Sequence, residues 1–123
     1  YEISNGSKIR KAIQLGSELI VSTANLDPYP MKIKKQFISL ASLSSIENKR
    51  DNVIVSNTGP TGLIKNNGGI ANLLDSSLEQ LNFVYPNFLK EKTIYNRLGD
   101  KPLIILSILL IPLNLRSFKR STN

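Results

Sequence analysis

Residues 102–115 read Pro-Leu-Ile-Ile-Leu-Ser-Ile-Leu-Leu-Ile-Pro-Leu-Asn-Leu, and this almost wholly apolar stretch decides how the chain can fold. A run of this kind must be buried in a protein core or in a bilayer. As an α-helix it would be only ~21 Å long, against a hydrocarbon core of ~30 Å. Extension through Phe118 gives ~25 Å, with Arg116 reaching towards the head groups. Length alone therefore leaves three interpretations open: a membrane helix, a buried core helix and an interfacial segment.

The remainder of the chain has the composition of one folded domain. The whole chain is 123 residues long and 41% hydrophobic, which is enough for a real core. It contains no cysteine and no histidine. This excludes a disulfide framework and a cysteine nucleophile within the sequence, and it removes the commonest metal ligand and general base. We therefore expect no metal site and no cofactor.

The net charge of +7 is spread along the chain in short clusters. Solvated helix faces explain such clusters best, and attraction to anionic lipid is the next interpretation. A dispersed pattern disfavours nucleic acid as a partner, because nucleic-acid-binding proteins gather their basic residues on one face. The clusters fall within residues 8–11, 32–35, 49–50, 90–92 and 119–120.

Hydrophobic spacing predicts alternating helices and strands. Asn5-Gly6-Ser7 offers a helix cap, and the helix is expected to end at Gly16. Residues 31–49 form the longest periodic segment, with a buried stripe predicted at Ile33, Phe37, Leu40, Ala41, Ser44 and Ile46. Strands are expected at 18–23, 52–56, 61–64, 70–74 and 77–85, loops at 25–30 and 65–69, and irregular structure from 86 to 100. This order predicts parallel strands first and an antiparallel finish, in an α/β layer arrangement with helices on at least one face.

Three motifs occur in the order found in one known family. Tyr1-Glu2-Ile3 is similar to the residues that follow the family's nucleophilic cysteine, and residues 56–64 (SNTGPTGLI), with Gly68-Gly69-Ile70, resemble its Asn-x-Gly strand and hairpin. Residues 93–100 (TIYNRLGD) resemble its Thr-x-Tyr-x-Arg-x-Gly-(Asp/Asn) motif, which precedes the last membrane helix. Together they make the chain resemble the carbon-nitrogen hydrolase (nitrilase-like) domain of the apolipoprotein N-acyltransferase family. Residues 24–30 add a likeness to its cyanobacterial members.

The resemblance implies a fold and a location. The fold class would be α/β: the C-terminal half of a nitrilase-like α-β-β-α sandwich, followed by one transmembrane helix. Residues 1–100 would belong to the hydrolase-like domain, 101–118 to the transmembrane helix and 119–123 to a basic cytoplasmic tail. The chain would then lie in the plasma (inner) membrane, with its hydrolase-like domain on the periplasmic face. The basic residues flanking the apolar run do not by themselves give an orientation.

The resemblance also implies acyl transfer in two steps. A cysteine thiolate takes an acyl chain from a phospholipid as a thioester, and the N-terminal amine of a diacylglyceryl-cysteine apolipoprotein then attacks that thioester. A glutamate acts as general base and a lysine stabilises the oxyanion. These three groups would lie upstream of Tyr1, so we expect the fragment alone to be inactive. The expected partners are the phospholipid donor, the apolipoprotein acceptor and the membrane, with no nucleic acid.

Nine residues are candidate site residues through this resemblance, and each has a purely structural alternative. Glu2 would bond the turn that carries the nucleophile or pair with the catalytic lysine, and Tyr1 would orient the thiol. A solvated helix-start glutamate and a core tyrosine are the alternatives. The others are expected to form the substrate pocket: Asn25 and Tyr29 in a lid loop, Asn57, Thr58 and Gly59 in its wall, and Tyr95 and Arg97 at the lipid head groups. For these the alternatives are a surface loop, a strand break and packing where domain and helix meet.

Two other functions stay open at this level. A basic, membrane-tethered binding module fits the charge and the lack of a nucleophile. A soluble nitrilase-type amidase fragment would bury the apolar run in an oligomer interface. The residue that precedes Tyr1 discriminates between them, because a cysteine there, behind further apolar helices, fits only the acyltransferase.

Overall fold

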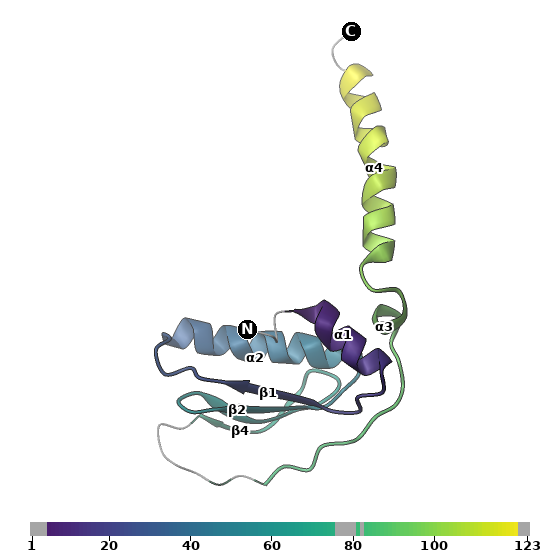
Figure 1. Ribbon diagram of the computed structural model, residues 1–123. Coiled ribbons are helices and arrows are strands. Elements are labelled where there is room, and N and C mark those ends of the chain that lie inside the picture. The colour runs from purple at the N-terminus through teal and green to yellow at the C-terminus, as the bar shows by residue number, and fades with distance from the viewer. Residues whose placement is uncertain (1–4, 76–80, 82, 121–123) are drawn as a thin grey trace.

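The computed structural model describes residues 5–75, 81 and 83–120, and the side chains of these except at 75 and 112–120 (Figure 1). The described residues form four helices and four strands, and this mixed α/β class is the one that the hydrophobic spacing predicts. Along the chain these are α1 (Gly6–Gln14), β1 (Ile20–Ala24), α2 (Met31–Asn48), β2 (Asn52–Ser56), β3 (Pro60–Ile64), β4 (Ile70–Asp75), α3 (Ile94–Leu98) and α4 (Lys101–Arg120).

The four strands form one sheet in the order β1-β2-β3-β4. β1 and β2 are parallel, and their register pairs Ile20 with Asn52 and Ala24 with Ser56. β2 and β3, and β3 and β4, are antiparallel. The predicted change from parallel to antiparallel pairing is therefore confirmed. The parallel pairing of β1 with β2 places the carboxyl ends of both strands at the same end of the sheet, and the loops that follow them meet there.

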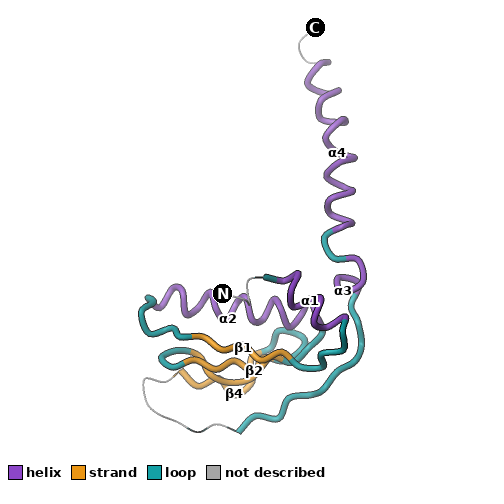
Figure 2. Tube along the Cα trace, in the orientation of Figure 1, coloured by secondary structure: helices purple, strands orange, loops and turns teal. Residues whose placement is uncertain are grey.

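Helices α1 and α2 lie on one face of this sheet (Figures 1 and 2). The core between α2 and the sheet consists of Leu26, Phe37, Ala41, Ile54 and Ile64, each at most 2% exposed. Phe37, Ala41 and Ser44 of the predicted stripe are buried, but Ile46 is 52% exposed. Polar Ser45 and Asn48 take the buried positions of that last turn, because their side chains bond carbonyl groups of the preceding turn.

Two buried charged residues hold the turn after α2 to distant segments. The Arg50 guanidinium donates to the carbonyl oxygens of Ser17 and Glu91, and the Asp51 carboxylate accepts from the backbone N–H groups of Asn66 and Asn87. Hydrogen bonds of this kind compensate the cost of burying a charge. They tie the extended segment that follows β4 along the end of the sheet.

The segment after β4 differs from its prediction in two ways. Leu81 and residues 83–85 are not in a strand, and residues 77–80 and 82 of the expected strand lie outside the described part of the chain. The stretch expected to be irregular, 86–100, contains α3. Thr93 begins this helix with a capping box, in which its hydroxyl accepts from the N–H of Asn96 and the Asn96 side chain accepts from the N–H of Thr93. A helix of five residues is too short to show a hydrophobic period.

Helix α4 covers the apolar run and projects away from the sheet and its helix layer (Figure 1). Its described apolar side chains are exposed: Leu103, Ile104, Ile105, Leu106, Ile108, Leu109, Leu110 and Ile111. Within the residues that the structure describes, none of the helices combines the length and apolar character needed to cross a membrane. The expected helix is confirmed, whereas its crossing of a bilayer, the second half of the sandwich and the domain limits remain predictions.

Candidate functional site

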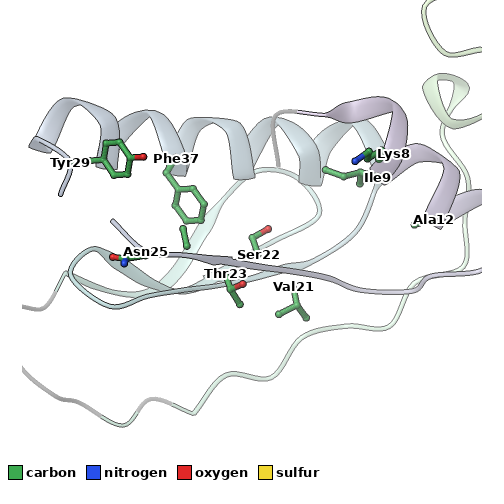
Figure 3. A pocket seen from close by; sticks show the side chains of 10 residues that line it. Lys8, Ile9, Ala12, Val21, Ser22, Thr23, Asn25, Tyr29 and Phe37 are labelled. Carbon is green, nitrogen blue, oxygen red and sulfur yellow. The ribbon is translucent and has the colours of Figure 1, made fainter. Parts of the chain in front are cut away.

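A pocket of about 530 Å³ lies between α1, β1 and α2 (Figure 3). Phe37 and Ser22 point into the space between β1 and α2, whereas Val21 and Thr23 point to the other side of β1. The pocket therefore extends around both sides of β1, which is an edge strand of the sheet. Its lining combines apolar and polar side chains: Lys8, Ile9, Ala12, Val21, Ser22, Thr23, Ala24, Asn25, Tyr29 and Phe37.

Local sequence explains how α1 reaches this pocket. Asn5 caps the helix, because its side-chain oxygen accepts from the N–H of Lys8. Lys8, Ile9 and Ala12 then share one side of the helix and line the pocket. The helix begins near the pocket, so its positive N-terminal dipole and the Lys8 side chain favour a negative group there.

Asn25 and Asn57 meet at the carboxyl ends of β1 and β2. The Asn57 amide donates to Asn25 Oδ1 over 2.8 Å, and Asn57 Oδ1 accepts from the N–H of Leu26 over 2.9 Å. These bonds join the loop after β1 to the loop after β2. A second hollow of about 570 Å³ adjoins them, between Thr23–Asn25 and Val55–Asn57. Ligand sites of open α/β sheets gather at this end of parallel strands.

Thr58 and Gly59 follow Asn57 in the turn between β2 and β3, and they line neither of these two hollows. The Lys34 ammonium donates to the Thr58 carbonyl, which ties the β2–β3 turn to α2. A Cβ atom on Gly59 would lie 2.9 Å from Leu26 Cδ1 and 3.0 Å from Ser56 Oγ. A side chain at position 59 would push against the buried Leu26, so glycine lets the turn pack closely on the loop that carries Asn25.

Tyr95 and Arg97 belong to α3 and do not line the pocket. Burial raises the pKa of Tyr95, and the carboxylates of Glu47 and Asp100 raise it further. The pKa of Glu47 is also raised, mainly by burial and secondarily by Asp100. Tyr95, Glu47 and Asp100 thus form a cluster where α3 meets α1 and α2, away from the Asn25–Asn57 junction.

The structure thus brings Asn25, Tyr29 and Asn57 to one region, with Thr58 and Gly59 supporting it. Tyr1 and Glu2 lie outside the described residues. Sequence reasoning missed the pocket positions of Lys8, Ile9, Thr23 and Phe37. The stripe predicted for residues 31–49 indicated that Phe37 is inward-facing, but not that it shares a cavity with residues of α1. In the part of the chain described, no three carboxylates gather closely enough to hold a metal ion.

A mixed sheet covered by one layer of helices, with a pocket beside its parallel pair, defines this chain as part of an α/β domain. No family model matches the sequence. An apolipoprotein N-acyltransferase from Prochlorococcus marinus subsp. pastoris is 55% identical over 123 residues, which is 100% of this chain and 25% of that protein. Another from Prochlorococcus marinus is 42% identical over 104 residues, covering 85% of this chain and 21% of that protein.

An apolipoprotein N-acyltransferase from Parasynechococcus marenigrum is 40% identical over 98 residues, covering 80% of this chain and 21% of that protein. The chain belongs to the apolipoprotein N-acyltransferase family, as its motifs predicted, and these relatives are cyanobacterial. It spans about a quarter of the length of the curated relatives that it matches.

Proposed function

We propose that the complete protein containing this sequence transfers an acyl chain to the N-terminus of an apolipoprotein, and that this chain builds one wall of its active site. The observation that carries the proposal is identity of 55% to an apolipoprotein N-acyltransferase along the whole chain. The acceptor is proposed from that name. A phospholipid donor fits the apolar side chains of Ile9, Val21 and Phe37 in the pocket.

In the proposed reaction, a cysteine thiolate attacks the ester carbonyl carbon of the phospholipid. The ester C–O bond breaks, the lysolipid oxygen takes up a proton, and a thioester forms. The amine of the apolipoprotein's first residue then attacks the thioester carbonyl, the C–S bond breaks, and the amine loses its proton as the amide forms. The cysteine is proposed directly before Tyr1, a few residues ahead of α1, whose N-terminal dipole favours the thiolate.

The candidate residues then receive proposed roles. Asn25 and Tyr29 shape the mouth of the pocket, and Asn57, Thr58 and Gly59 hold that loop against the sheet. Glu2 and Tyr1 support the nucleophile, and the general base and the oxyanion-stabilising lysine lie elsewhere in the complete protein. Tyr95 and Arg97 act at the lipid head groups, where the planar guanidinium suits a phosphate.

We further propose that the enzyme works at a membrane, with residues 101–118 in the bilayer. The exposed apolar side chains of α4 support this, because water is an unfavourable environment for so much apolar surface. The hydrolase-like part would lie on the periplasmic side of the inner membrane.

The test is acyl transfer by the purified complete protein in detergent micelles. Phosphatidylethanolamine serves as donor and a synthetic diacylglyceryl-cysteine lipopeptide as acceptor, and mass spectrometry detects the added acyl chain. We expect transfer with the natural sequence and none when the proposed cysteine is replaced by serine. Unchanged transfer after that replacement, or a residue other than cysteine before Tyr1, would contradict the proposal.

A further inference from the structure

Helix α1 presents two opposite faces with different neighbours. Lys8, Ile9 and Ala12 face the pocket. Gly6, Arg10 and Gln14 recur every four residues, so they form a row on the other side of the helix. All three members of this row contact α3 or the glycine that ends it. Helix α1 therefore lies between the pocket and α3.

The contacts of this row are close. Gln14 Nε2 donates to the carbonyl oxygen of Asn96 over 2.5 Å. A Cβ atom on Gly99 would lie 2.5 Å from Arg10 Nη1, so the guanidinium occupies the space that a side chain at position 99 would need. A Cβ atom on Gly6 would lie 3.2 Å from the Tyr95 hydroxyl. The two glycines thus leave room for the Tyr95 hydroxyl beside α1 and for the Arg10 guanidinium at the end of α3.

Helix α3 is itself held firmly to α2. Asn96 is fully buried, and its side-chain amide donates to Asn48 Oδ1 over 2.7 Å. The Thr93 hydroxyl donates to the Glu47 carbonyl over 2.5 Å. A buried polar group that is satisfied in this way is costly to disturb. Helix α3 is thus a fixed support against which α1 rests.

We propose that Gln14 is a positioning residue for the pocket: its bond to Asn96 holds α1 against α3 and so sets where Lys8, Ile9 and Ala12 stand. The consequence for catalysis rests on the proposed function, because it assumes that the pocket is the acyl-transfer site. Gln14 is the last residue of α1 and is exposed, so its side chain can be exchanged without disturbing the core.

The experiment compares two replacements of Gln14 in the complete protein. Gln14→Glu keeps the size but loses the donor and places a carboxylate against the Asn96 carbonyl, whereas Gln14→Lys keeps a donor of similar reach. Lys11→Ala, an exposed change on the same turn, is the matched control. Hydrogen exchange of the amides in residues 6–14 and the kinetics of acyl transfer are measured for each variant.

We expect Gln14→Glu to speed exchange in residues 6–14 about fivefold, because the hydrogen bond that holds α1 to α3 is lost. We expect kcat/KM to fall by about the same factor, since a displaced α1 moves Lys8 and Ile9 away from their places in the pocket. Gln14→Lys should restore both values, and Lys11→Ala should change neither.

Equal exchange in the Gln14→Glu and Gln14→Lys proteins overturns the positioning role, whether or not the enzyme is active. Faster exchange with unchanged kcat/KM overturns the link to catalysis. Absence of acyl transfer in the natural protein would instead refute the proposed function, and the exchange comparison would still decide whether Gln14 holds α1 to α3.

Discussion

Asn57 links two loops at the end of the parallel strands through both atoms of one amide. Replacing it with leucine keeps the size of the side chain but removes the bonds to Asn25 and to the N–H of Leu26. We expect the free energy of unfolding to fall by about 1 kcal/mol, because the side chain is exposed and water replaces part of the loss. Acyl transfer by the complete protein should fall as the Asn25 loop loosens.

Denaturant unfolding and the lipopeptide assay measure these two effects of Asn57→Leu. Asn67→Ala is the control, because Asn67 also bonds a nearby backbone N–H, that of Gly69, but in the hairpin turn between β3 and β4. A stability loss without any loss of acyl transfer would show that the Asn25–Asn57 junction is only structural.

Glu47 provides a pH-dependent test at the scale of single residues. Burial raises its pKa above the ordinary 4.5, and Asp100 adds to the shift. Its contribution to stability is therefore fully present below about pH 4.5 and is lost as pH rises through the higher folded pKa. Glu47→Gln should raise the melting temperature at neutral pH, and the gain should shrink as the solution is made acidic.

Glu91 is the matched control of opposite sign. A hydrogen bond from the Lys49 ammonium lowers its pKa, and the Lys49 charge contributes next. Its contribution is present above pH 4.5 and is lost as pH falls through the lower folded pKa. Glu91→Gln should thus lower the melting temperature slightly at neutral pH. A neutral-pH loss of stability in Glu47→Gln would contradict the explanation for that residue.

At the scale of elements, the proposed placement of α4 in a bilayer can be tested directly. We expect the chain to float with phospholipid vesicles in a density gradient, and a chain ending at residue 100 to remain in the aqueous fraction. Ile105→Lys with Ile108→Lys is the matched variant, because each lysine costs about 3 kcal/mol at the centre of a membrane helix. Equal flotation of all three chains would refute a membrane role for α4.

Elements also show where sequence patterns reach their limit. The bounds expected for the helix at 31–49 agree with α2 to within a residue, because eighteen residues carry several hydrophobic periods. Helix α3 was not predicted. Its capping box has Asn96 at the third helical position, where the usual sequence signature has glutamate or glutamine. Burial of Asn96 then depends on Asn48, a residue of another helix.

At the scale of the whole molecule, the sheet is covered by helices on one face only within the described chain. The other face carries Val21, which is 61% exposed, and Val55, which is 43% exposed. The nitrilase-like sandwich implied by the motifs would cover such a face with a second sheet, and this remains a prediction.

The amino-acid sequence by itself determined the alternation of helices and strands, the parallel-to-antiparallel order, the apolar helix and the family. Each of these follows from spacings within a segment or from short motifs in a set order. The tertiary structure alone decided that Asn25 bonds Asn57, that Lys8 and Phe37 share a pocket, and that Gln14 bonds Asn96 across 82 positions of the chain. Such contacts join groups whose separation in sequence has no period. The parallel pairing of β1 with β2 brings Asn25 to Asn57, and the packing of α1 between the pocket and α3 establishes the other two.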